Sequence, residues 1–225
     1  MAKWQVAQRG KRGINILLAA LFLIFALLFI HSLREIVPQL EGYRVAQAEY
    51  QLIREVAWPQ TGSGAQGSEY TEQSIDWAAL RRLNPDIIGW IVVDGTTIDY
   101  PIVRGRDNEY YLHRTFMKEQ NTSGAIFMDH RNCAGFFDPS TIIYGHNMQN
   151  GSMFAGLHDW TGNSFRIYTP SGVLEFEVFS KRTVAANDPM FSLLPVERCG
   201  RRVVTLSTCV FRQGDLRFIV QGILE

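Results

Sequence analysis

The chain has 225 residues, 46% of them hydrophobic and 20% charged, which suits one folded domain of ordinary size with an appendage. Basic and acidic residues balance at 22 each, so charge gives no indication of a nucleic-acid partner. Three cysteines are too few for a disulfide scaffold, and the odd count leaves at least one thiol free unless chains are cross-linked.

The N-terminal part predicts a single membrane anchor. Residues 14–33 are apolar except for Asn15, His31 and Ser32, and about 20 helical residues span the hydrocarbon core of a bilayer. Residues 1–13 carry four positive charges and no acid, so the positive-inside rule leaves this tail in the cytoplasm and the rest of the chain outside the membrane. A cleaved signal peptide and a buried core helix are the alternatives. The missing A-x-A-like pattern argues against the first, and the uninterrupted apolar face argues against the second.

Residues 34–74 are expected to form a helical stalk and a linker. Residues 38–58 carry an imperfect helical stripe, which predicts a stalk or a helix laid against the domain. The Gly/Ser-rich residues 61–68 predict a flexible connection. A short helix over residues 74–83 follows, with its N-cap at Ser74 or Asp76.

From residue 87 the pattern changes to short strands separated by turns. The strand-like runs are 87–93, 97–103, 125–128, 141–144, 164–168, 173–180, 202–208 and 216–224. Asp94-Gly95, between the first two, is a strong hairpin signal. Eight runs with few helices between them predict a mainly β domain over residues 75–225, built as a closed or nearly closed barrel.

Cys209 is the candidate nucleophile. It ends the strand-like run 202–208, and a polar loop with Gly214 and Asp215 follows it. A reactive thiolate needs a neighbouring cation or base to lower a thiol pKa that is ordinarily about 8.5. Buried cysteines are usually structural, so the residues alone leave both roles open.

His146 is the candidate base among five histidines. It follows the strand 141–144 after Gly145, and strand ends with glycine turns commonly present functional side chains. An imidazole can act as general base and then as general acid. A loop histidine without a task is the alternative. The other histidines are expected at the membrane edge or the protein surface: His31, His113, His130 and His158.

Arg217, eight residues after Cys209, is the candidate cation. If the loop between them closes a hairpin, the guanidinium can face the thiol and stabilise the oxyanion of a tetrahedral intermediate. A surface arginine on an edge strand is the alternative.

The other two cysteines allow rival arrangements. Residues 129–133 together with Cys199 could bind zinc, but no Cys-x₂-Cys or His-x₃-His spacing supports this, so no metal or cofactor is predicted. Cys133 and Cys199 could form a disulfide outside the cell or stay as unpaired thiols, and the sequence leaves this open.

Several motifs, in order, resemble the sortase family. They are TLSTC at residues 205–209 with Arg217 beyond it, and IIYGHNM at 142–148 with His146. Residues 84–103, 107–116 and 151–157 are similar to class B sortases in particular. The resemblance covers residues 75–225 and implies a sortase-type β-barrel with short peripheral helices. It also implies a membrane-anchored cysteine transpeptidase of Gram-positive bacteria.

The resemblance also implies roles for individual residues. Cys209 would attack a carbonyl in a C-terminal sorting signal to give a thioacyl enzyme. His146 would exchange protons, Arg217 would hold the developing negative charge, and Ser207 would lie near the substrate groove. An amine of a peptidoglycan precursor or a lysine of another surface protein would then accept the acyl group. No cofactor is implied.

One departure from the class concerns the substrate groove. Class B sortases usually have a long, helix-containing connection before the strand of the cysteine, whereas residues 182–201 form a short one here. Residues 187–198 could hold one short helical turn at most. Because this region helps to form the substrate groove in the family, the class alone does not set the sorting motif. An NPxT-like signal is the first hypothesis, with LPxT- and PPxT-like signals as alternatives.

Two other functions are weighed against transpeptidation. A thiol endopeptidase would form the same thioacyl enzyme and pass the acyl group to water. A membrane-tethered binding module would be expected to lose one of His146, Cys209 and Arg217, and the chain keeps all three.

Overall fold

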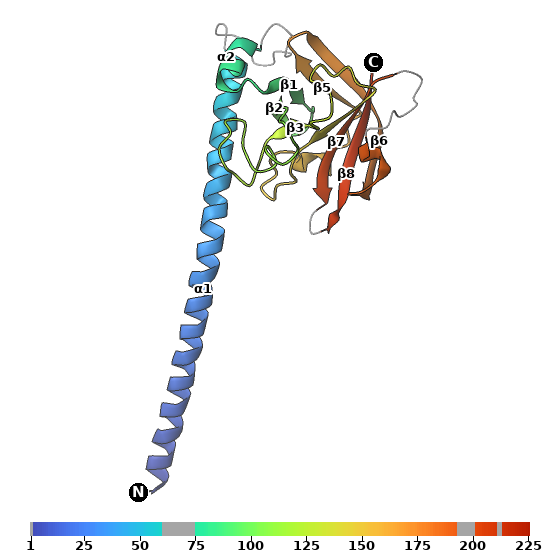
Figure 1. The fold of residues 1–225 in the computed structure, drawn as a ribbon. Coiled ribbons are helices and arrows are strands. Elements are labelled where there is room, and N and C mark those ends of the chain that lie inside the picture. The colour runs from blue at the N-terminus through green and yellow to red at the C-terminus, as the bar shows by residue number, and fades with distance from the viewer. Residues whose placement is uncertain (1, 60–74, 193–200, 211–212) are drawn as a thin grey trace. The chain divides into compact units, whose positions relative to one another are not determined.

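The computed structural model describes residues 2–59, 75–192, 201–210 and 213–225 (Figure 1). The chain divides into two compact units, Met1–Gly42 and Tyr43–Glu225. The predicted linker at 61–68 lies outside the described residues.

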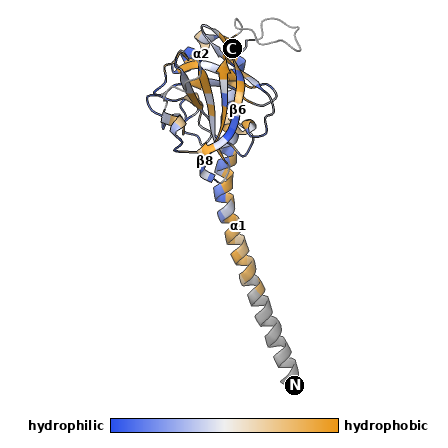
Figure 2. Cartoon of the chain, turned by 90° about the vertical axis from the view of Figure 1, so that its right-hand side faces the viewer, coloured by the Kyte–Doolittle hydropathy of each residue, from blue (hydrophilic) through white to orange (hydrophobic). Residues whose placement is uncertain are grey.

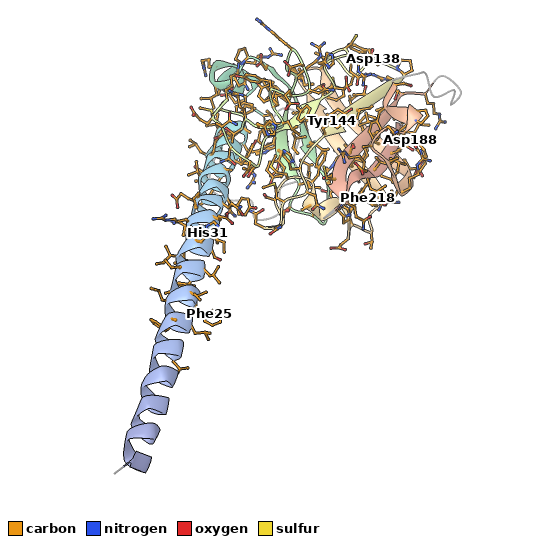
Figure 3. All side chains as sticks on the ribbon, turned by 60° about the horizontal axis from the view of Figure 1, so that its bottom comes forward. Phe25, His31, Asp138, Tyr144, Asp188 and Phe218 are labelled. Atoms are coloured by element: carbon orange, nitrogen blue, oxygen red, sulfur yellow. The ribbon has the colours of Figure 1, made fainter. Side chains whose placement is uncertain are left out.

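Helix α1 (Ala2–Ala57) contains a stretch that is long and apolar enough to cross a membrane. The candidate span begins at Ala20, and Figure 2 shows this part of the helix in the hydrophobic colour. Its apolar side chains are exposed, and Phe25 and His31 extend outward from the helix in Figure 3. An exposed apolar helix of this length is what a bilayer would cover, whereas the core helix of a soluble protein would be buried.

The last turns of α1, from Tyr43 onward, belong to the second unit. Tyr50, Ile53 and Ala57 recur at helical spacing and are almost completely buried. The Tyr50 hydroxyl donates to the Gly124 carbonyl at 2.8 Å, and Arg54 Nε donates to the Asp99 carbonyl at 3.1 Å. This part of the expected 38–58 helix is therefore laid against the domain.

Helix α2 (Trp77–Leu83) is short and capped at both ends. Asp76 is its N-cap, and the carboxylate accepts from the Ala79 N–H at 2.8 Å. Asn84 ends the helix, and its buried amide donates to the Phe116 carbonyl at 2.7 Å. The helix is thereby fixed to the loop that precedes β3.

Eight strands form a closed barrel in the order β1-β2-β3-β4-β7-β8-β6-β5, with β5 pairing back to β1. Their bounds are β1 Ile87–Val92, β2 Asp99–Val103, β3 Ile126–Met128, β4 Ser140–Tyr144, β5 Ser164–Thr169, β6 Gly172–Ala185, β7 Val203–Val210 and β8 Gln213–Leu224. The pairs β2–β3 and β4–β7 are parallel, and the other pairs are antiparallel. The predicted mainly β, eight-stranded closed barrel is confirmed.

The strands β6, β7 and β8 extend beyond their predicted ends. β6 continues to Ala185, which pairs with Leu216 of β8. Its last residues include Lys181, Arg182 and Thr183, so the apolar pattern fades although the backbone ladder goes on. The connection to β7 is correspondingly shorter. Its described part holds one 3-10 turn, η3 (Pro189–Ser192), and residues 193–200 lie outside the described residues.

Strands β4 and β7 are buried along most of their length and reach the surface at their C-terminal ends. The four residues of β4 before Tyr144 and the six residues of β7 before Cys209 are all buried. Tyr144, Cys209 and Val210 are only half-buried. Both strands thus leave the packed wall of the barrel at neighbouring points.

Candidate active site

The parallel pairing of β4 with β7 brings His146 toward Cys209. Tyr144 and Ser207 are partners in this ladder, and the Gly145 N–H donates to the Ser207 carbonyl at 3.1 Å. His146 and Cys209 each lie two residues beyond the Tyr144–Ser207 pair. Because parallel strands run in the same direction, both residues leave the sheet at the same edge.

The antiparallel pairing of β7 with β8 places Arg217 directly opposite Cys209. Side chains of such partners lie on the same face of a sheet. Arg217 Nη1 donates to the carbonyls of Gly214 at 2.6 Å and Leu216 at 3.0 Å. These two hydrogen bonds hold one edge of the guanidinium to its own hairpin.

One hollow of about 250 Å³ joins the four residues singled out in the sequence, His146, Ser207, Cys209 and Arg217. The remaining lining residues are Asn108, Glu109, Leu112, Phe127, Tyr144, Gly145 and Thr208. The hollow lies where β4, β7 and β8 present their strand ends.

His146 is held as a neutral base. Its Nε2 lies 2.7 Å from the Leu112 carbonyl, and since a carbonyl only accepts, Nε2 carries the hydrogen and Nδ1 the lone pair. Burial lowers the pKa of His146, the Leu112 hydrogen bond opposes that effect, and the nearby His113 lowers it further. The unprotonated imidazole that a general base requires is therefore favoured at neutral pH.

Ser207 and Thr208 bring buried hydroxyls to the hollow. Neither hydroxyl oxygen has a hydrogen-bond partner among the described residues. A buried hydroxyl without a partner costs about 1–3 kcal/mol.

Asp129, which the sequence offered only as part of the rival zinc arrangement, is a buried carboxylate bonded to two residues that line the hollow. Asp129 accepts from Arg131 Nε at 2.8 Å and Nη2 at 2.7 Å, from the Tyr144 hydroxyl at 3.0 Å and from Asn108 Nδ2 at 3.0 Å. Burial alone would raise the pKa of Asp129, but these hydrogen bonds, led by those of Arg131, hold it well below its usual range. The carboxylate thus orients Asn108 and Tyr144, two walls of the hollow.

The same cluster joins the short β6–β7 connection to the site. Arg131 Nη2 donates to the Phe191 carbonyl at 2.8 Å, and the Phe191 ring stacks on Tyr144 with centroids 6.5 Å apart. Phe191 belongs to η3. The described part of the connection is therefore packed beside the hollow.

The surface position expected for His158 is wrong. His158 is half-buried, and its Nε2 lies 3.3 Å from the Cys209 carbonyl. The ring fills space over Phe218, with centroids 4.6 Å apart, which explains its burial despite its polar neighbours in sequence. His113, by contrast, is exposed and lies 3.3 Å from Glu109, as expected.

The rival zinc arrangement finds no support in the described residues, where no three His, Cys, Asp or Glu side chains are placed to hold a metal. Asp129 is committed to Arg131, and the buried Asn132 amide donates to Asp138 at 2.9 Å. Cys133 is exposed and forms no disulfide with another described residue. Cys199 lies outside the described residues, so a Cys133–Cys199 disulfide stays an open prediction.

The sortase domain model matches residues 91–225, which is more than half of the chain, and the chain belongs to the sortase family. Its relatives are class B members. It is 45% identical to sortase B of Listeria monocytogenes over 104 residues, 44% of this chain, and 29% identical to sortase B of Staphylococcus aureus over 73% of it. These matches span 42% and 62% of the relatives' lengths. The structure of Clostridium perfringens sortase B aligns with a TM-score of 0.60 at 29% identity, covering 66% of this chain and 98% of that one.

Proposed function

We propose that this chain is a membrane-anchored cysteine transpeptidase with Cys209, His146 and Arg217 as its catalytic residues. The observation that carries the proposal is their convergence on one hollow from three strand ends. Membership of the sortase family supports it, because sortases are cysteine transpeptidases. The three residues match the needs of acyl transfer, which are a nucleophile, a proton carrier and an oxyanion stabiliser.

Acylation of the enzyme would use all three side chains. The Cys209 thiol gives its proton to Nδ1 of His146, and Sγ attacks the carbonyl carbon of the sorting signal. The oxyanion that forms is stabilised by the guanidinium N–H groups of Arg217 that its own hairpin does not use. As the intermediate collapses, the C–N bond breaks and His146 protonates the leaving amine, which leaves a thioacyl enzyme.

Deacylation by an amine reverses these roles. The amine attacks the thioacyl carbon, His146 accepts its proton, and Sγ leaves as the new amide forms. The free thiol is restored, and no external oxidant or energy source is needed. We propose a peptidoglycan-precursor amine or a lysine of another surface protein as the acceptor.

The donor substrate is proposed to be a surface protein with an NPxT-like C-terminal sorting signal, with LPxT- and PPxT-like signals as alternatives. Ser207 would bind this signal, since its buried hydroxyl has no other partner in the described part of the chain. The β6–β7 connection, through Phe191, would shape one side of the groove.

Helix α1 is proposed to anchor the enzyme in the cell membrane, crossing it once. The basic residues before the apolar run support a cytoplasmic N-terminus. The catalytic domain would then lie outside the cell, where surface proteins and wall amines are found.

The test is mass spectrometry of products from a panel of sorting peptides, with and without triglycine. A transpeptidase yields a triglycine-ligated product, whereas an endopeptidase yields only the hydrolysed fragment. A binding module without a working site leaves every peptide intact. Cys209→Ala is expected to abolish cleavage, and unimpaired cleavage by that variant would refute the mechanism.

A further inference from the structure

The backbone ladder between β4 and β7 stops just before the catalytic residues. Its last described rung is the hydrogen bond from the Gly145 N–H to the Ser207 carbonyl. If the parallel ladder continued, the next hydrogen bond donated to β7 from this side would join the Asn147 N–H to the Cys209 carbonyl. The backbone of Asn147 instead forms an antiparallel bridge with Met153, so the loop has turned away from β7.

The side chain of Asn147 takes the place of the lost rung. Its Nδ2 donates to the Cys209 carbonyl at 3.0 Å. The same Nδ2 lies 3.1 Å from Nε2 of His158. The amide orientation is fixed by chemistry, because a carbonyl accepts only and the Asn147 oxygen cannot donate to it.

His158 extends this connection to β8. Its Nε2 lies within hydrogen-bond distance of both Asn147 Nδ2, at 3.1 Å, and the Cys209 carbonyl, at 3.3 Å, and the tautomer decides which of the two it bonds. The ring stacks on Phe218 with an interplanar angle of 26°, and Phe218 follows Arg217 in β8. Phe218 is labelled in Figure 3. One amide and one ring therefore join the chain segments that carry His146, Cys209 and Arg217.

We propose that Asn147 and His158 are positioning residues that set the geometry of His146, Cys209 and Arg217. Neither lines the hollow with these three, so they act through the backbone carbonyl of Cys209 and the ring of Phe218. This inference rests on the proposed function. A misplacement of about 1 Å at reacting groups can slow catalysis about a hundredfold.

The first test is Asn147→Asp, which keeps the side-chain shape but replaces the donor by a carboxylate that repels the Cys209 carbonyl. Asn150→Asp is the matched control on the same exposed loop, because Asn150 uses only its oxygen, which accepts from Ser152. We expect kcat for peptide cleavage to fall about tenfold to a hundredfold in Asn147→Asp, while KM stays within about twofold. The control is expected to match the wild type in both constants.

A second readout separates positioning from mere stability. The pH profile of Cys209 alkylation by iodoacetamide, followed on the Cys209 peptide by mass spectrometry, reports how the thiol is coupled to His146. Asn147→Asp should change this profile at an unchanged thermal midpoint. A wild-type profile and a wild-type kcat in a folded Asn147→Asp variant would overturn the inference. If that variant does not fold, Asn147→Ser replaces it under the same criteria.

His158→Phe tests the second positioning residue while keeping a ring against Phe218. Because Asn147 and His158 act on one carbonyl, the losses in the double variant should be smaller than the product of the single losses. Independent, multiplicative losses would show that they do not act as a unit. If the wild type cleaves no peptide, the proposed function fails, whereas the alkylation profiles still decide the positioning role.

Discussion

At the scale of single residues, the site is a set of groups held in one protonation or bonding state. One ring nitrogen of His146, Nε2, is hydrogen-bonded to the Leu112 carbonyl, and the other, Nδ1, remains available as a base. The hydroxyl of Ser207 is buried without a hydrogen-bond partner in the described residues, and most buried polar groups do have one. Both features have measurable consequences.

His146 is expected to make stability depend on pH. Its folded pKa lies below the unfolded value of about 6.5, so its contribution is fully present above that pH and is lost as pH falls through the folded value. The wild type should lose more free energy of unfolding than His146→Gln when pH is lowered from about 7.5 to about 5. Urea denaturation at both pH values measures this. Equal losses in the two proteins would contradict the lowered pKa.

Ser207→Ala is expected to separate binding from stability. The free energy of unfolding should stay constant or rise by up to about 1 kcal/mol, because an unpaired hydroxyl is removed, while KM for the sorting peptide rises. Thr205→Val is the control on the same strand. It leaves the buried Gln221 amide, 3.3 Å from the Thr205 hydroxyl, without its partner and should cost about 1–3 kcal/mol. Equal destabilisation of both variants would refute the assignment.

At the scale of elements, the ion pair between buried Asp129 and exposed Arg131 joins the end of β3, the end of β4 and the 3-10 turn η3. Asp129 follows β3, Tyr144 ends β4, and Phe191 lies in η3. The described part of the short connection between β6 and β7, which holds one 3-10 turn, is therefore fixed beside the hollow.

Arg131→Gln is expected to destabilise the protein by about 3 kcal/mol, because it leaves the fully buried Asp129 carboxylate without its cation. Arg201→Gln, an exposed arginine before β7, should change stability by less than about 0.5 kcal/mol. Denaturant titration near neutral pH measures both. Because the folded pKa of Asp129 is lowered, the difference between wild type and Arg131→Gln should shrink in acid, as pH falls below about 3.9.

The positions of the strands could be predicted from the sequence, but which strands pair with one another could not. All eight runs were found because turns such as Asp94-Gly95 punctuate apolar segments. The pairing of Cys209 with Arg217 could be predicted because the two residues lie on adjacent strands of one hairpin, close together in the sequence. The parallel pairing of β4 with β7 joins segments far apart in the chain, so no local pattern predicts that His146 meets Cys209. The resemblance to sortases supplied that link. No local pattern shows that Asp129 also binds Asn108 and Tyr144, because these residues are distant in the chain. The same holds for His158, which lies against Cys209 and Phe218.

At the scale of the whole molecule, the chain combines an exposed apolar helix with a compact unit that holds the candidate site. The unit begins at Tyr43, within α1, because the last turns of that helix bury Tyr50, Ile53 and Ala57. The proposed anchor and the packed helix are thus parts of one continuous element with different surroundings.

Truncation should distinguish these two parts of α1. A chain that starts at Tyr43 is expected to stay folded with an unchanged thermal midpoint, and to lose membrane association. A chain that starts at residue 60 also loses Tyr50 and Ile53, each of which stabilises by about 1.5–3 kcal/mol through burial, so its midpoint should fall by several degrees or more. Flotation with liposomes and thermal denaturation measure the two effects. Equal midpoints for the two truncations would refute the packing role.

The central claim is that Cys209 forms a thioacyl bond with a sorting signal. The most direct measurement is intact-protein and peptide mass spectrometry after the enzyme is mixed with a sorting peptide in the absence of an amine. We predict a hydroxylamine-sensitive adduct on Cys209 whose mass equals the N-terminal part of the cleaved peptide, and none on the exposed thiol of Cys133. Peptide cleavage without any adduct on Cys209, or with the adduct on Cys133, would contradict the account.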